Sequence, residues 1–198
     1  MKKRILTFLA LLPLVFTAQD KNWGIGLRGG DPSGFSFKKY MGEKALEINI
    51  GRTYMFSRRG WYDDHFYDWY HDKNYGYKEF HYLGYRASAP IAIQVHYLFQ
   101  KPLKVDGLDW YWGVGGQMRY RSFAYDYRYK VYGDPNWYYA RDQRVTDIDL
   151  GVDGVLGLEY TFKEVPLSLF VDANVFVELI DNPFWFHGQS GLGIRYNF

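Results

Sequence analysis

Charged residues recur at every second position in several stretches of this chain, and that spacing could serve acid–base or ion-pair chemistry. Asp149, Asp153 and Glu159 alternate with apolar residues, as do Arg119 and Arg121 in an earlier stretch. Alternation with period two places such residues on one face of a β-strand. One hairpin would join the two stretches, so we expect the two arginines to lie near Asp149 and Asp153. The chemistry that follows is a buried ion-pair network or, as the functional alternative, a path for protons or ions.

The strand faces predicted to point into the interior of the fold carry both positive and negative side chains. Buried charges must be paired and hydrogen-bonded, which favours a structural network over a conducting path. A turn near residue 42 would also place Lys38 directly opposite Glu47, a favourable cross-strand pair. The predicted interior charge network is Arg28, Lys38, Glu47, Arg119, Arg121, Asp149, Asp153, Glu159, Asp172 and Arg195. The same parity also turns inward His96, Asp109 and Glu178.

A second group of ionisable residues lies between positions 60 and 82, where His and Asp are mixed with aromatic residues. Such side chains could bind zinc or a similar metal ion. Their spacing matches no metal-binding motif, and the chain contains no cysteine. We therefore predict no metal site and no cofactor. The residues concerned are Asp63, Asp64, His65, Asp68, His71, Asp72 and His81.

The sequence offers no pattern for nucleophilic or nucleotide-dependent catalysis. None of the five His residues has a Ser two positions later, the spacing by which a base could activate a hydroxyl group on one strand face. No phosphate-binding glycine loop or nucleophile elbow is present. We predict no catalytic residues, and a lipid-modifying enzyme with an unrecognised site remains the alternative.

Aromatic residues make up 21% of the chain, and many of them lie between the alternating stretches. Tyr and Trp give a large contact area at low entropic cost and are enriched in interfaces. A partner protein, a glycan or lipopolysaccharide could each use such a surface. The predicted recognition surface comprises Trp61, Tyr62, Trp69, Tyr70, Trp137, Tyr138 and Trp185.

β-Strands must position all these residues. Alternating stretches predict eight strands at 22–29, 35–40, 46–51, 91–99, 108–121, 148–160, 167–179 and 191–198. An even number of strands can close as an antiparallel up-and-down barrel, with apolar residues outside and polar residues inside. An interior of eight strands is just wide enough for side chains to fill, and inward glycines leave room for long ones.

The connections between these strands alternate in length. Short turns are predicted near residues 42, 104 and 164 at one end. The connections at the other end are predicted near 32, 70, 134 and 185; the first of these is short and the other three are longer, as is typical of membrane barrels. The two longest excursions are 53–89 and 123–145. Alternating aromatic residues at the edges of the second indicate a hairpin that rises out of the membrane as a ribbon.

The two ends of the chain predict export and membrane assembly. A basic start, an apolar run with Pro13 and a small-residue cleavage site indicate a signal peptide at 1–19, which leaves one domain at 20–198. The signal removes three of the 24 Lys and Arg residues, leaving 21 against 22 Asp and Glu, so charge gives no argument for nucleic acid. At the other end, apolar residues alternate up to the terminal aromatic Phe198.

Gly193, Tyr196 and Phe198 resemble the C-terminal assembly signal of bacterial outer-membrane barrels. Together with Gly29–Gly34, Glu43–Glu47 and Leu156–Leu167, the domain at 20–198 resembles the small eight-stranded outer-membrane barrels, the group that includes OmpX and the membrane domain of OmpA, and in particular the Bacteroidota-type proteins. This resemblance implies an eight-stranded barrel in the outer membrane of a Gram-negative bacterium. It implies no shared activity.

The partners expected on this basis are outer-membrane lipids, lipopolysaccharide and the outer-membrane assembly machinery. The expected role is a non-enzymatic, porin-like envelope protein that stabilises the envelope or binds a partner through outer loops. A secreted lipocalin-like binder is a third hypothesis. Lipocalins line the interior with apolar residues, and the alternation here runs the other way.

Overall fold

The computed structural model describes residues 21–53, 60–180 and 184–198. The predicted signal peptide at 1–19 lies outside these described residues. Within them the elements are β1 (Trp23–Gly30), β2 (Ser33–Met41), β3 (Lys44–Arg52), α1 (Trp61–Lys73), β4 (Glu79–Ala87), β5 (Ile91–Pro102), β6 (Leu108–Lys130), β7 (Tyr138–Thr161), β8 (Leu167–Glu178) and β9 (Phe186–Asn197).

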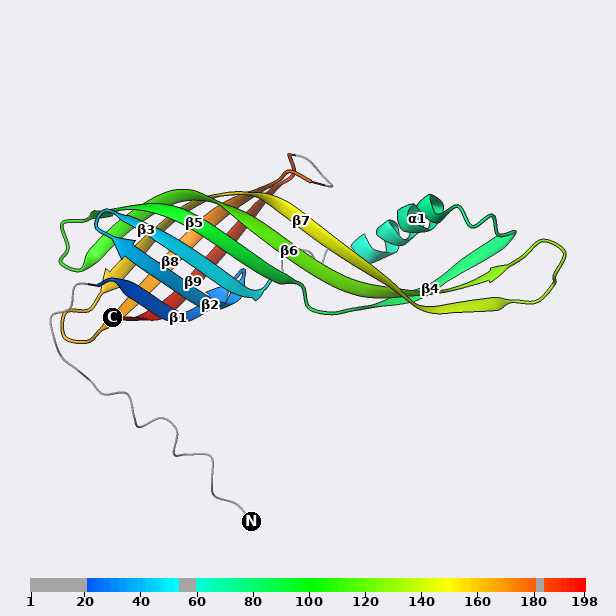
Figure 1. The fold of residues 1–198 in the computed structure, drawn as a ribbon, viewed down its shortest axis with the longest axis horizontal. Helices are drawn as coiled ribbons and strands as arrows, with labels where there is room; N and C mark the ends of the chain where they lie inside the picture. Colours follow the sequence, from blue (N-terminus) through cyan, green and yellow to red (C-terminus); the bar gives the residue numbers. More distant parts are fainter. Residues whose placement is uncertain (1–20, 54–59, 181–183) are drawn as a thin grey trace, which may run out of the picture.

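Eight of the described strands close into an antiparallel barrel (Figure 1). Each pairs with the next, with β4 left out of the ring, and β1 pairs with β9 through Gly24↔Asn197 to Gly30↔Gly191. At this seam the backbone N–H of Trp23 donates to the carbonyl oxygen of Phe198 at 2.8 Å, and the N–H of Phe198 donates back to Trp23 at 2.9 Å. The predicted fold, an eight-stranded antiparallel up-and-down barrel, is confirmed.

The long excursion predicted at 53–89 is not a loop throughout. Residues 61–73 form α1, and residues 79–87 form β4, which pairs with the part of β6 beyond the ring. The prediction missed both because Asp and aromatic residues have only modest helix propensity, which obscured the helical spacing of Tyr62, Phe66 and Tyr70. The predicted ribbon at 123–145 is confirmed, since β6 and β7 stay paired up to Tyr129↔Tyr138.

The period of two decides which side chains face in and which face out. Along β8 the exposed and buried residues alternate almost without interruption. Large apolar side chains point away from the barrel: Leu27 is 59% exposed and Val114 is 60% exposed. A continuous apolar outer surface of this kind suits contact with lipid and is costly in water.

Aromatic side chains form a belt near the end of the barrel that carries the short turns. Phe99 stacks on Trp112 with ring centroids 4.7 Å apart, and Tyr196 stacks on Phe198 at 6.3 Å. Trp23, on β1 beside the same seam, is 46% exposed. Aromatic girdles of this type mark the interface between the hydrocarbon and the aqueous phase in membrane barrels.

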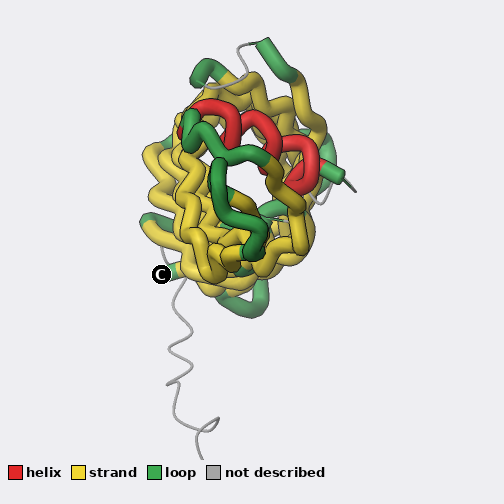
Figure 2. The backbone as a smooth tube through the Cα atoms, turned by 90° about the vertical axis from the view of Figure 1, so that its right-hand side faces the viewer, coloured by secondary structure: helices red, strands yellow, loops and turns green. Residues whose placement is uncertain are grey.

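The opposite end carries a large projection, which we call the extension. It consists of α1, β4 and the outer parts of β6 and β7 (Figure 1). β6 has 23 residues and β7 has 24, whereas β8 and β9 have 12 each. A membrane-spanning strand needs only about 9–11 residues. The outer parts of β6 and β7 therefore stand clear of the barrel, and α1 lies on one side of them (Figure 2).

None of the helices in the described residues is both long and apolar enough to span a membrane.

Candidate functional site: the charged interior and the extension

The barrel interior contains charged side chains from seven strands of the ring, and β5 contributes Gln94, His96 and Gln100. All ten residues of the predicted interior charge network are at most 6% exposed, and so are His96 and Glu178. Asp109 lies nearer the mouth, where it is only partly buried. The structure therefore brings the predicted residues into one enclosed space, where each charge requires a partner.

Glu159 is the centre of the cluster nearest the turns. It accepts hydrogen bonds from Lys38 Nζ at 2.9 Å, Arg195 Nη1 at 2.8 Å and the Tyr40 hydroxyl at 2.9 Å. The ammonium group of Lys21 also bonds to this carboxylate. One buried anion is thus shared by three cations and a hydroxyl.

The register prediction for Lys38 and Glu47 is confirmed, but the two do not form the expected pair. They are directly opposite across β2 and β3. Lys38 reaches instead across the barrel to Glu159, and Glu47 pairs with Arg195. Arg195 therefore links the two carboxylates, which stand on different sides of the lumen.

Arg28 and Asp172 form a bidentate pair in the middle of the barrel. Both guanidinium–carboxylate distances are 2.6 Å. The pair fits because β9 has Gly191 at this level: a Cβ atom there would lie 2.2 Å from Arg28 Cζ. The Tyr111 hydroxyl also donates to Asp172 at 3.2 Å. Planar bidentate pairing is the geometry that Arg favours with carboxylates.

The arginines of β6 lie near Asp149, as predicted, but not near Asp153. Arg119 Nη2 is 3.4 Å from Asp149 Oδ2, and Arg121 Nη2 is 3.0 Å from it. Arg119 also approaches Glu178 at 3.4 Å. Asp153 lies further down the barrel, where its Oδ2 atom is 3.1 Å from His96 Nε2. The prediction for Asp153 was wrong because successive inward residues of a strand lie about 7 Å apart along the barrel. Asp153 is two such steps away from Asp149.

Two interior aromatic residues were missed by sequence analysis. Phe170 and Phe176 of β8 are buried beside the charges. Arg195 Cζ lies 3.6 Å from the ring centroid of Phe170, and Arg119 Cζ lies 4.2 Å from that of Phe176. Aromatic faces attract desolvated cations. The sequence did carry a signal for them. Phe170 lies two positions from Asp172 and Phe176 two positions from Glu178, so the strand alternation places both rings on the inward face.

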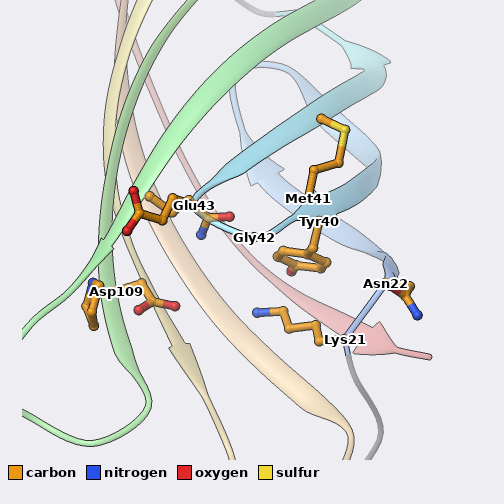
Figure 3. Close-up of a pocket in the computed structure, with 9 residues that line it drawn as sticks. Lys21, Asn22, Tyr40, Met41, Gly42, Glu43 and Asp109 are labelled. Carbon is orange, nitrogen blue, oxygen red and sulfur yellow. The ribbon is translucent and has the colours of Figure 1, made fainter.

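At the mouth with the short turns lies a cavity of about 500 Å³. Lys21, Tyr40 and Asp109 line it, together with Glu43 (Figure 3). The Lys21 ammonium lies 4.0 Å from the centroid of the Tyr40 ring. Both residues bond to Glu159, so the cavity abuts the ion-pair cluster. Its inner limit is made of paired charges.

The residues of the predicted recognition surface do not come together. Tyr62, Trp69 and Tyr70 lie on the side of α1 that packs on the sheet of the extension. Trp137 and Tyr138 lie at the far tip, whereas Trp185 lies just before β9, with its ring 5.2 Å from that of His187. The side chain of Trp61 lies outside the described part of the structure.

Phe66 is the centre of the aromatic cluster that α1 forms with the sheet. It is 0% exposed, and its ring lies 4.6 Å from that of Tyr82 and 5.1 Å from that of Tyr125. The Tyr125 hydroxyl donates to the carbonyl oxygen of Tyr62 at 2.9 Å. Burial raises the pKa of the Tyr70 hydroxyl to about 12. These contacts give the extension an aromatic core of its own.

The His and Asp residues of α1 are not arranged as a metal site. Asp63, Asp64, Asp68 and Asp72 are exposed. No group of three or more His, Cys, Asp or Glu side chains in the described ranges is placed to hold a metal ion. What α1 presents to solvent is a row of carboxylates.

The pairing of β6 with β7 contains a bulge, a register shift between Tyr125 and Tyr127, and acid is expected to loosen it. The backbone N–H of Asp142 donates to Asp126 Oδ1 at 2.8 Å, and Arg86 bonds to Oδ2 at 2.7 Å. These contacts hold the pKa of Asp126 below its usual range. A depressed folded-state pKa means that this stabilisation is complete above the ordinary carboxyl pKa of about 4 and is lost as pH falls through the folded value.

Hydrogen exchange measured against pH checks this prediction. After correction for intrinsic rates, protection of the Asp142 amide should drop below about pH 4, while barrel amides should not change. In Asp126→Asn that pH dependence should disappear. An unchanged Asp142 profile in the wild-type protein would show that the contact does not hold the bulge.

Comparisons with known proteins agree with the geometry. No protein-family model and no curated protein sequence matches the chain. Among solved structures, the fold is similar to the N-terminal β-barrel domain of OprF from Pseudomonas aeruginosa, with a TM-score of 0.55 and 13% sequence identity. The match covers 91% of this chain and 100% of that one. At this identity the likeness concerns the barrel fold alone.

Proposed function

We propose that this chain is a non-enzymatic integral outer-membrane barrel of a Gram-negative bacterium, which anchors the extension at the cell surface. The observation that carries the proposal is the distribution of polarity: large apolar side chains cover the outside of a closed barrel, and ion pairs fill the inside. A water-soluble barrel would need the reverse. The likeness to the OprF barrel domain supports the same assignment.

The filled interior favours an anchoring role over that of a wide pore. The Glu159 cluster, the Arg28–Asp172 pair and the group of Arg119 and Arg121 with Asp149 and Glu178 follow one another along the lumen. Eight strands leave little space beyond these side chains. The surrounding lipids, including lipopolysaccharide, and the outer-membrane assembly machinery are the partners that such an anchor requires. Binding of a further ligand would be the task of the extension.

Folding into detergent micelles and lipid vesicles tests the proposal. We expect the protein to migrate faster on a gel before boiling than after it, to stay in the membrane fraction after carbonate washing and to show no large steady conductance in planar bilayers. A product that is folded and soluble without detergent would overturn the membrane assignment. A large open conductance would contradict the filled interior.

The same material addresses the enzymatic alternative. Lipid A extracted from cells with and without the protein should have the same mass, because we assign no reaction to the barrel. A mass shift that depends on the protein would replace the anchoring role with a lipid-modifying one.

A further inference from the structure

The side of the extension opposite α1 carries a cluster of cations that the proposed function leaves unexplained. In the antiparallel pairs of β4, β6 and β7, paired residues point to the same side of the sheet. His81 pairs with Arg128, and Arg128 also pairs with Tyr139. Figure 1 shows α1 along one side of these strands and no described element along the other.

Three basic side chains converge on one indole ring, that of Trp137, in the connection from β6 to β7. Arg128 Cζ and Lys130 Nζ each lie 4.4 Å from its centroid. The His81 ring lies 5.1 Å away. We call these four residues the Trp137 site. A ring that contacts two cations holds them in place without neutralising them.

The Trp137 site has fewer carboxylates than cations. Lys130 Nζ lies 3.4 Å from the carboxylate of Glu79, and both side chains are partly exposed to solvent. For Arg128, none of the described carboxylates lies within 4.0 Å, and its Nε atom is buried without a hydrogen-bond partner. Asp126 pairs with Arg86 and Asp142 with Arg144, while Asp134, in the connection that holds Trp137, accepts hydrogen bonds from the Asn136 backbone N–H and the Tyr138 hydroxyl. A guanidinium held in this way can still form charge-assisted hydrogen bonds to an added anion.

The two sides of the extension differ in charge. On the α1 side, Asp64, Asp68 and Asp72 follow one another at intervals of four residues and are exposed. They form one line along the helix. The side with Arg128 and Lys130 is the basic one. A polyanion would therefore be repelled by α1 and attracted to the Trp137 site.

We propose that the Trp137 site binds the phosphate groups of a phosphorylated saccharide, namely the carbohydrate part of lipopolysaccharide. Arg and Lys are the usual ligands of phosphate, Arg through its planar fork. The edge of an indole ring offers apolar contact to a sugar beside the phosphate. The inference rests on the proposed function in one respect: the extension must stand outside the cell, where this carbohydrate surrounds it.

Calorimetric titration of the folded, full-length protein in detergent micelles tests the proposal. The probe is delipidated lipopolysaccharide carbohydrate, used with its phosphates and after chemical dephosphorylation. We expect binding of the phosphorylated form only, with an affinity that falls as salt rises. Arg128→Gln should weaken binding about tenfold, the loss of one charged hydrogen bond. Lys130→Gln and Trp137→Ala should also weaken it.

The matched control variants also replace a cation by glutamine, but at positions away from the Trp137 site. Arg144→Gln is on the same side of the sheet, where Arg144 pairs with Asp142, and Lys163→Gln is in the short turn between β7 and β8, at the other end of the barrel. Both should bind like the wild-type protein. Arg128→Lys, which keeps the charge, should recover part of the affinity if the tested variants disturb only the site.

Three results would overturn the proposal. One is equal binding of the dephosphorylated carbohydrate, and another is unchanged affinity in Arg128→Gln. The third is self-association that is lost both in Arg128→Gln and when Asp64, Asp68 and Asp72 are changed to Asn, because the basic side would then contact α1 of a second copy. Gel migration before boiling reports barrel folding separately, so a failure of the proposed function is distinguishable from a failure of the site.

Discussion

Replacement of Glu159 by Gln is expected to lower the free energy of unfolding by about 3–5 kcal/mol, the usual cost of removing one partner from a buried ion pair. The change keeps the shape of the side chain and removes its charge. Lys38 and Arg195, both fully buried, then lose the carboxylate that they share. Lys21 loses its partner at the mouth of the barrel. A neutral amide can accept at most part of these hydrogen bonds.

Urea unfolding of the protein in lipid vesicles, followed by gel migration and tryptophan fluorescence, measures this loss. Glu164→Gln is the matched control, because Glu164 lies in the exposed turn that joins β7 to β8 and is only five residues away. It should change stability by less than about 0.5 kcal/mol. If Glu159→Gln were as stable as the control, the cluster would not hold the barrel closed at this level.

Replacement of Phe66 by Ala is expected to detach α1 from the extension while the barrel stays folded. Truncation of a buried Phe costs about 3–5 kcal/mol, and Phe66 is 0% exposed among Tyr82, Tyr125 and Tyr70. An isolated helix of 13 residues is marginal in water. Once its central contact is lost, α1 should unfold locally and β4, on which Phe66 packs through Tyr82, should be weakened, while the strands of the barrel stay folded.

Hydrogen exchange with peptide resolution checks this prediction. Peptides from 61–73 and 79–87 should lose protection in Phe66→Ala, and peptides from β8 and β9 should not. Tyr67→Ala is the control on the same helix, since Tyr67 is 47% exposed. Loss of protection throughout the barrel would mean that the extension and the barrel unfold as one unit.

These two predictions separate the molecule into parts with different tasks. The Glu159 cluster stabilises the ring from inside. The aromatic core around Phe66 stabilises α1 on one side of the extension, and none of the described elements covers the other side. The Trp137 site lies on that uncovered side. We therefore propose the ligand-binding role for the extension and the anchoring role for the barrel.

Much of the barrel could be predicted from sequence because strand periodicity is a local property. The alternation in β8 decides that Val171 faces outward and Asp172 faces the lumen, and no distant residue is needed to reach that conclusion. The even number of alternating stretches then predicts closure. The same reasoning found all ten members of the interior charge network. It could not tell which of them would bond to which.

The extension was harder to predict. Its strands continue the alternation of β6 and β7, which is why the ribbon was foreseen. α1 was not, because Tyr, Trp and Asp have weak helix propensity and its helical pattern is short. The seven aromatic residues of the predicted recognition surface look alike in sequence. The structure distinguishes them, since Tyr70 is buried against Phe80, whereas the ring of Trp137 contacts the cations of Arg128 and Lys130.

The sequence by itself determined which side chains point into the barrel, which point outward, and that the strands close into a ring of eight. Only the tertiary structure decided the partners: Lys38 faces Glu47 across its hairpin, yet bonds to Glu159 from the far wall. The physical reason is that parity depends on neighbours along the chain. Partner choice depends on the tilt and stagger of strands around the lumen, which bring together residues 121 positions apart.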